Sequence, residues 1–345
     1  MDRRVNAGSV QAVANYVRAG DEFGYKIALY GRKDPRYPSI RFSTDLVSFD
    51  YVVFIIESDR SWMSGLRMPR ILMQVPRHRR VIVDTDGTYN QLISVDNYDR
   101  NHMNECQRRR WLLHHEIIGD KIFQPTVTPI EPGVLALPFF GFDPASVIPD
   151  TAAPKKRFDV LHVGHNWWRW REVSGTLLPA IGKVRPHMNG VCFIGSWWDA
   201  PPAAAKELDL EGAFAVDNAW LRRLDIQVNA AVPYTHVTKV MSEGRINIMT
   251  QRPLLRRLKF LTSKYFEIFC ADTIPLVMLD PDHAESVYGP CGRELALHDS
   301  VAEKLLDVLS RRDNYWEIVQ EVRRHLAANH SYHSRLEDLC QALQS

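Results

Sequence analysis

The sequence predicts an α/β protein built from two Rossmann-like, doubly wound lobes that face a cleft. The chain has 345 residues, which is too long for one ordinary hydrophobic core and typical of about two domains. Short apolar runs of strand length alternate with amphipathic stretches, as in parallel sheets covered by helices. A proline-containing stretch over residues 144–158 interrupts the alternation, which then restarts. We therefore expect an N-terminal domain over residues 1–148 and a C-terminal domain over residues 149–345.

The first lobe begins with a loop and a helix instead of a strand. Asn6 to Ser9 forms the predicted loop, and the apolar spacing after it predicts a helix over residues 10–19. A doubly wound domain normally has a strand before such a loop, so we expect the N-terminus to be irregular or incomplete. Further strands are expected at 26–30, 50–57, 70–75, 80–84, 123–126 and 134–139, with a helix at 104–118.

Two carboxylates follow the predicted strand at residues 80–84. Asp84 and Asp86 stand just beyond its carboxyl end, where α/β sheets assemble their sites, and either could deprotonate an acceptor hydroxyl. Aspartates after a strand are equally common as turn formers. His102, in a polar and aromatic tract, is an alternative base, although a lone histidine is more often structural.

The second lobe repeats the strand and helix alternation from residue 159 onward. Its expected strands are 159–163, 191–195, 225–229 and 274–279, and its expected helices are 173–184, 234–242, 300–310, 314–329 and 334–343. The loop after the first of these strands, Gly164 to Arg171, contains three tryptophans and two arginines. Aromatic faces stack on sugars or bases and arginines reach phosphates, but such a loop can also serve packing alone.

Residues 252–279 carry the strongest functional signal. The segment reads as a basic loop, a short helix with Thr262 or Ser263 at its N-cap, a turn and a buried strand. Arg252 and Lys264 belong to the basic residues around the helix start, a combination that suits a diphosphate. Glu267 lies one turn inside the helix, where a surface ion pair is the alternative to a ligand contact.

Ser263-Lys264-Tyr265-Phe266-Glu267-Ile268, followed by Ile274-Pro275-Leu276-Val277, resembles the nucleotide-sugar segment of GT-B glycosyltransferases, especially the group similar to the spore-coat protein CgeB. The resemblance implies a GT-B fold and a role for Glu267 in accepting hydrogen bonds from the donor ribose. It also makes Gly164, His165 and Arg169 donor-side candidates, together with Arg252, Thr262, Ser263 and Lys264. Lys259 stands where many such enzymes carry a sugar-contacting glutamate, which leaves the donor sugar and the stereochemical outcome open.

Composition narrows the class of protein further. The chain is 45% apolar and 24% charged with a net charge of +2, which describes an ordinary globular protein. Its five cysteines form no C-x-x-C pair, and no apolar run reaches the length of a membrane span. We therefore expect a cytoplasmic protein without a transmembrane segment. His114, His115 and Glu116 do not match the H-E-x-x-H spacing of a zinc site. The pair Asp84 and Asp86 could suggest a metal-diphosphate site in a glycosyltransferase, but that role belongs to the GT-A class, so we expect no metal.

These features together predict a metal-independent glycosyltransferase, with a nucleoside diphosphate sugar as substrate and no separate cofactor. The acceptor is expected to be a glycan, a lipid-linked sugar, a protein or a small molecule, and nucleic acid is not expected as a partner. Two alternatives stay open: a nucleotide-sugar epimerase or hydrolase on the same fold, and a non-catalytic relative that only binds nucleotide.

Overall fold

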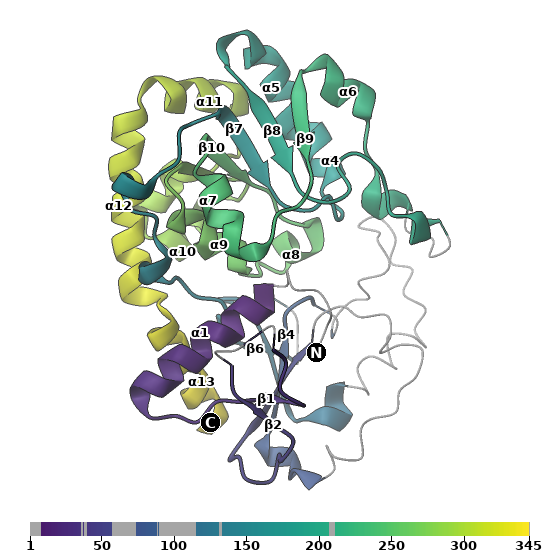
Figure 1. Ribbon diagram of the computed structural model, residues 1–345, viewed down its shortest axis with the longest axis vertical. Helices are drawn as coiled ribbons and strands as arrows, with labels where there is room; N and C mark the ends of the chain where they lie inside the picture. The colour runs from purple at the N-terminus through teal and green to yellow at the C-terminus, as the bar shows by residue number, and fades with distance from the viewer. Residues whose placement is uncertain are drawn as a thin grey trace. The chain divides into compact units, whose positions relative to one another are not determined.

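The computed structural model describes residues 8–35, 37, 40–56, 74–87, 89, 115–130, 133–206 and 211–344. The chain divides into two compact units (Figure 1). Unit 1 comprises Met1–Gly141, Arg257–Ser263 and Tyr332–Ser345, and unit 2 comprises Phe142–Arg256 and Lys264–Ser331. The α/β class predicted from the sequence is confirmed, since each unit contains a parallel sheet with helices around it.

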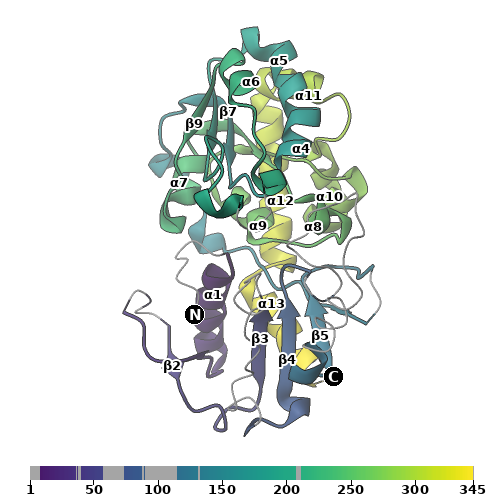
Figure 2. The same cartoon turned by 90° about the vertical axis from the view of Figure 1, so that its right-hand side faces the viewer.

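Unit 1 contains a four-stranded parallel sheet with the order β3-β4-β5-β6, of which Figure 2 shows β3, β4 and β5 side by side. The strands are β3 (Val52–Ile56), β4 (Arg80–Asp84), β5 (Lys121–Gln124) and β6 (Leu135–Ala136). Every residue of β4 is buried, as expected for a strand covered on both faces. A separate two-stranded sheet pairs β1 (Leu29–Tyr30) with β2 (Phe42–Ser43).

The C-terminal helix of the chain belongs to unit 1. α1 (Gly8–Phe23) lies beside α13 (Tyr332–Gln344), and the ring of Tyr16 contacts both Tyr332 and Phe139. Lys121 donates to the carbonyls of Ala342 and Leu343 at 3.4 and 3.3 Å, which satisfies carbonyls that the helix end leaves free. The domain boundary expected at residue 148 assigns α13 to the second lobe. In the structure, α13 contacts α1 and belongs to unit 1.

Unit 2 contains a five-stranded parallel sheet with the order β11-β10-β7-β8-β9. Its strands are β7 (Phe158–Val163), β8 (Val191–Ile194), β9 (Ile226–Asn229), β10 (Gly244–Met249) and β11 (Ile274–Val277). From β7 the chain first adds β8 and β9 on one side, then β10 and β11 on the other. The order therefore reverses between β7 and β10, the position at which doubly wound sheets bind their ligands.

Helices cover both faces of this sheet (Figures 1 and 2). They are α4 (Trp170–Glu172), which continues through a π-helical turn at Val173–Leu177 into α5 (Leu178–Val184), α6 (Asn218–Arg223), α7 (Val237–Met241), α8 (Pro253–Arg257), α9 (Ser263–Glu267), α10 (Pro281–Tyr288), α11 (Val301–Ser310) and α12 (Arg312–Asn329). Among the described residues, none of the helices combines the length and the apolar character needed to cross a membrane.

Several sequence expectations fall outside the described residues. These are the irregular N-terminus, residues 70–73 of the strand expected at 70–75, and the first part of the helix at 104–118, of which 115–118 are seen as helix. Strand 26–30 shortens to the two residues of β1, and strand β10 was not predicted. Gly244, Arg245 and Asn247 interrupt the apolar pattern of β10. The buried Asn247 side-chain nitrogen is nevertheless satisfied, because it donates to the Met241 carbonyl at 2.6 Å.

Candidate functional site

Charged side chains gather at the carboxyl ends of β7 and β10, where the strand order of unit 2 reverses. The loop after β7 supplies His165 and Arg169, and the chain after β10 supplies Arg252. We call the following set the switch-point cluster: His165, Arg169, Glu172, Arg252, Arg256 and Lys264. Three of the sequence-predicted phosphate ligands, Arg169, Arg252 and Lys264, thus belong to one group of neighbouring charges.

The loop after β7 is fixed by the loop after β8. The Gly164 N–H donates to the Ile194 carbonyl at 2.8 Å, and the Trp198 indole donates to the Gly164 carbonyl at 2.7 Å. Gly195 lies so close to Gly164 that a Cβ atom added to Gly195 would be 2.0 Å from the Gly164 carbonyl oxygen. This packing requires the absence of a side chain at residue 195 and sets the direction of the chain leading to Arg169.

His165 is held as a neutral hydrogen-bond donor. Its Nδ1 accepts from the Ser196 backbone N–H at 3.0 Å, so the ring proton is on Nε2. Burial, together with the positive charges of Arg169 and Lys264, lowers the pKa of His165 to about 4. The side chain therefore adds no positive charge at neutral pH and offers one N–H.

Two of the three tryptophans of this loop, Trp167 and Trp168, pack together with Trp197 from the loop after β8. Trp167 and Trp197 contact the ring of Phe214 at centroid distances of 4.9 and 4.8 Å, and Trp168 packs against the same cluster. Trp168 and Trp197 have φ values of 57° and 70°, in the left-handed region that bulky residues rarely adopt. The contacts therefore favour a packing role for these rings over ligand contact, the other role that the sequence left open.

Arg169 is a buried cation close to a second one. Its guanidinium donates to the carbonyls of His165 and Thr250, which follow β7 and β10. Burial and the neighbouring charge of Arg252 lower the pKa of Arg169 to about 10, which still leaves it charged at neutral pH. Arg252 is only 7% exposed. Two guanidinium groups held together away from water favour the binding of an anion.

Glu172 was not identified from the sequence. Its side chain is 3% exposed and pairs with Arg256, whose side chain is 45% exposed. Its Oε2 is buried and has no hydrogen-bond partner in the described part of the chain. Burial raises the pKa of Glu172 to about 7, although Arg256, the Gln251 backbone N–H and Arg169 each favour the ionised form. The only sequence signal was an acidic residue directly after an Arg- and Trp-rich loop.

Glu267 is buried and pairs with Lys264, which lies one turn earlier in helix α9. The Lys264 Nζ lies 2.8 Å from the Glu267 Oε2, and the carboxylate side chain is 7% exposed. The Tyr265 hydroxyl donates to the Gln251 side chain at 2.8 Å, which ties α9 to the chain after β10. Since α9 has five residues, the cationic side chains contribute more to an anion site here than its helix dipole does.

The remaining donor-side candidates, Thr262 and Ser263, are part of unit 1. Gly8, at the start of α1, approaches Ser263 so closely that an added Cβ would lie 2.4 Å from its Oγ. Thr262 is half-buried, and the preceding Leu261 N–H donates to the Pro125 carbonyl at 2.6 Å. Their roles in donor binding stay predictions.

The two first-lobe aspartates differ in their surroundings. Asp84 is fully buried, and its Oδ2 accepts from the Tyr89 N–H at 2.9 Å and from the Gln124 side chain at 3.1 Å. These bonds hold the turn after β4 and favour a structural role. Asp86 is half-buried, and its role as a base stays a prediction. His102, the third predicted catalytic residue, lies outside the described residues.

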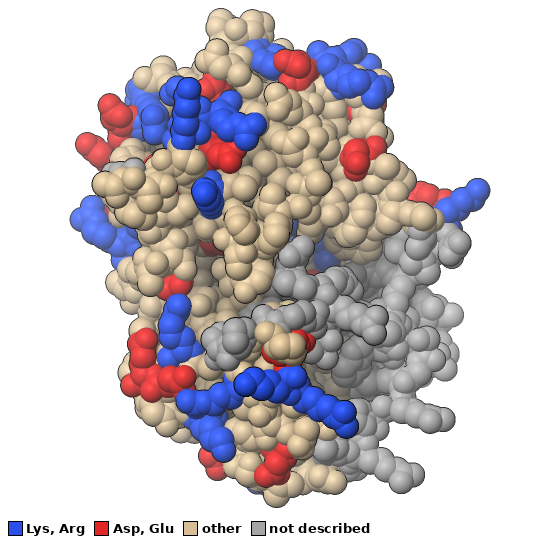
Figure 3. All heavy atoms as spheres, in the orientation of Figure 1, with Lys and Arg blue, Asp and Glu red and all other residues tan. Residues whose placement is uncertain are grey.

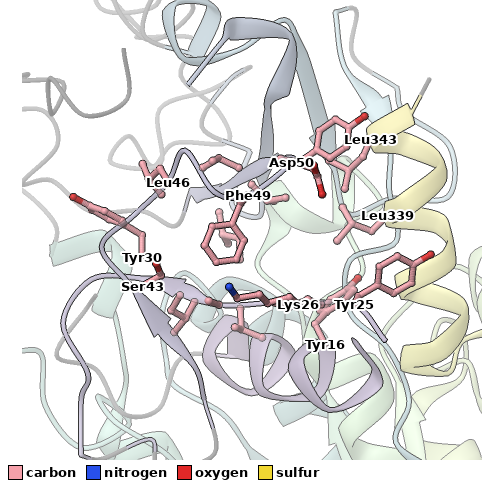
Figure 4. Close-up of a pocket in the computed structure, with 18 of the residues that line it drawn as sticks. Tyr16, Tyr25, Lys26, Tyr30, Ser43, Leu46, Phe49, Asp50, Leu339 and Leu343 are labelled. Carbon is pink, nitrogen blue, oxygen red and sulfur yellow. The ribbon is translucent and has the colours of Figure 1, made fainter. Parts of the chain in front are cut away.

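Unit 1 also encloses a cavity of about 440 Å³ between α1, α13, β3 and the chain leading into β1 (Figure 4). Its walls are mainly aromatic and aliphatic, and Figure 4 shows Lys26 directed towards the ring of Phe49, 5.2 Å from its centre. None of the predicted site residues lines this cavity.

Residues 178–341 match the protein family described as glycosyl transferase-like. No curated protein matches the sequence. An α-glucosyltransferase solved in complex with UDP and a 13-mer DNA shares the fold with a TM-score of 0.62 and 11% identity, over 99% of this chain and 97% of that one. The same kind of enzyme with UDP and DNA containing an HMU base gives 0.58 and 11%, over 100% and 98%. The T4 phage enzyme BGT with UDP and Mn²⁺ gives 0.54 and 11%, over 98% and 94%.

These findings correct one expectation and confirm others. Nucleic acid was not expected as a partner, and this is wrong, because the similar structures include glucosyltransferases in complex with DNA. The predicted GT-B fold and the nucleotide-sugar substrate agree with the similar structures and the family match, whereas the CgeB-like subgroup remains a resemblance. The chain therefore has a GT-B fold, and residues 178–341 match a glycosyl transferase-like family.

Proposed function

We propose that this protein transfers a glucose-type sugar from a UDP-sugar to a hydroxyl group on DNA. The observation that carries the donor half of this proposal is the switch-point cluster of unit 2. Arg169, Arg252, Arg256 and Lys264 provide four cationic side chains, of which Arg256 pairs with Glu172 and Lys264 pairs with Glu267, a carboxylate beside the cluster. The four cations outnumber the two carboxylates, so the site keeps a net positive charge that favours a nucleotide-sugar diphosphate.

Charge of this kind supports the chemical step as well as binding. Transfer leaves a nucleoside diphosphate, and cations already in position stabilise the negative charge that grows on it in the transition state. Two backbone carbonyls orient the buried guanidinium of Arg169, so its positive charge is held in a fixed position, which mobile water could not provide. We infer that these side chains provide the charge for which other transferases use a metal ion.

Two carboxylates have separate proposed roles. Glu267 accepts hydrogen bonds from the donor ribose, and Lys264 pairs with the same carboxylate. Asp86 is the proposed base for the acceptor hydroxyl, because Asp84 is buried and already accepts two hydrogen bonds.

The DNA acceptor is supported by the similar structures and by the surface of unit 1. The α-glucosyltransferases with this fold were solved with UDP and DNA together, in one case with an HMU base. In unit 1, Lys and Arg side chains gather on the face visible in Figure 3. The exposed basic residues of α1 and of the chain around β1 and β2 are Arg18, Lys26, Arg32, Lys33 and Arg41. Such a band suits the phosphate backbone, which supplies most of the affinity for DNA.

The test is a transfer assay with UDP-glucose labelled in the sugar. One DNA duplex carries a single HMU base and the other carries the ordinary base at that position, and each is incubated with EDTA or with Mn²⁺. We expect label on the HMU duplex in EDTA and none on the ordinary duplex. Release of free glucose with neither duplex labelled would favour the hydrolase alternative, and labelling only with Mn²⁺ would contradict the inference about metal.

A further inference from the structure

Glu172 is an unusual component for a site that binds an anion. Its carboxylate lies among the very cations that the proposed function assigns to the donor diphosphate. It pairs with Arg256 through Oε1, it lies near Arg169, and the Gln251 backbone N–H favours its ionised form. A negative charge here repels the ligand, so the charge needs an explanation other than direct ligand binding.

The surroundings of Glu172 explain when the charge is useful. While no donor is bound, Arg169 and Arg252 repel each other in a buried place, and an anion between the cations reduces that repulsion. The Glu172 side chain, at 3% exposure, is too buried to be solvated as a free ion. Its Oε2 has no partner in the described residues, so one of the two oxygens gains little from ionisation.

We propose that Glu172 is a positioning residue that acts as a placeholder anion: it neutralises the arginines in the donor-free protein and takes up a proton when the diphosphate arrives. The proton comes from solvent and is given back when the nucleoside diphosphate leaves. Oε2 is the oxygen that receives it. This inference rests on the proposed function, because it requires the diphosphate to bind at the switch-point cluster.

The protonation balance of Glu172 suits this exchange. Its pKa of about 7 means that both forms are populated at neutral pH. Two negative charges placed on the same arginines raise this pKa, so binding favours the protonated form. The direction of the pH dependence follows from linkage. A ligand whose binding is accompanied by proton uptake binds more tightly at low pH, and its affinity falls as the pH rises through 7.

The pKa values of His165 and Tyr265, two neighbours of this cluster, are displaced away from the range in which Glu172 titrates. The charged and titratable groups around it are His165, Arg169, Arg252, Arg256, Lys264, Tyr265 and Glu267. The pKa of His165 lies near 4, and burial holds the pKa of Tyr265 well above its usual value. UDP-glucose is the suitable probe, because its two phosphates are esterified on both sides and carry no proton that titrates near pH 6, unlike a terminal phosphate.

The experiment measures UDP-glucose binding by calorimetry between pH 6 and pH 8, in buffers of different ionisation enthalpy. For the wild type we expect uptake of close to one proton at pH 7.5 to 8 and a roughly tenfold loss of affinity from pH 6 to pH 8. Glu172→Gln imitates the protonated form. We expect it to bind UDP-glucose at pH 8 about as tightly as the wild type does at pH 6, without proton uptake.

Glu321→Gln is the matched control, because Glu321 is an exposed residue of α12 in a surface pair with Arg324. It should retain the pH dependence of the wild type. Equal weakening of Glu172→Gln at pH 6 and pH 8 would mean that the carboxylate only supports Arg256, and the inference would be wrong. A wild type that binds UDP-glucose independently of pH would also overturn it. If the wild type binds no UDP-glucose at any pH, the proposed donor itself fails, a result separate from the other two.

Discussion

Replacing Glu267 by alanine separates ribose binding from diphosphate binding. A hydrogen bond to a charged group contributes about 1.5 to 3 kcal/mol, so loss of the ribose contact should weaken UDP binding roughly tenfold to over a hundredfold. The same change releases Lys264, which now lies 2.8 Å from the carboxylate, and leaves its charge available to phosphates. We therefore expect Glu267→Ala to bind inorganic pyrophosphate at least as tightly as the wild type.

The assay is calorimetric titration of UDP and of pyrophosphate into both proteins, with a melting curve of each. Lys264 is 26% exposed and can reach water when its partner is removed, so the stability cost should stay near 1 kcal/mol. Unchanged UDP affinity would refute the ribose role. Parallel loss of affinity for both ligands would show that the pair holds the fold of the site and does not contact the ribose.

Three further variants test other parts of the site. Asp86→Asn should lower the rate of transfer by about a hundredfold or more, because the proposed base is lost, and should lower the melting temperature less than Asp84→Asn does. Asp84→Asn should instead lower the melting temperature, since it disrupts two buried hydrogen bonds at a cost of roughly 1 to 3 kcal/mol; the reverse pattern would exchange their roles. Gly195→Ala places a methyl group 2.0 Å from the Gly164 carbonyl and should reduce both stability, by roughly 1 to 3 kcal/mol, and UDP-glucose affinity. An unaltered affinity in that variant would show that the loop after β7 does not set the donor site.

Local sequence pattern was sufficient for much of unit 2. The apolar runs that became β7, β8 and β11 are buried at every position, so their pattern and their environment agree. β10 was not predicted because Asn247 interrupts its apolar pattern, and a partner of the Asn247 side-chain nitrogen, the Thr273 hydroxyl at 3.3 Å, is distant along the chain. The amphipathic pattern of α13 showed that one face is buried but not against which unit.

The site was predictable only where a residue type itself indicates its chemistry. Arg169, Arg252 and Lys264 were recognised as cations suited to phosphate, and they prove to be neighbours. Glu172 was missed because its importance depends on burial and on a partner 84 residues later, Arg256, which periodicity does not reveal. The tryptophans were candidates for stacking on a sugar or base, but Trp167 and Trp197 both pack on the ring of Phe214, which is distant along the chain.

The proposed function depends on the switch-point cluster being the donor site. The most direct test compares the affinity of UDP for two arginine variants in the loop after β7. Arg169 is oriented by two carbonyls at the sheet edge, whereas Arg171 is exposed. Calorimetric titration should show that Arg169→Gln weakens UDP binding tenfold or more, as expected for the loss of a charge-assisted hydrogen bond of about 1.5 kcal/mol or more. Arg171→Gln should bind like the wild type. Equal affinity of both variants for a UDP that the wild type binds would place the donor elsewhere and contradict the account.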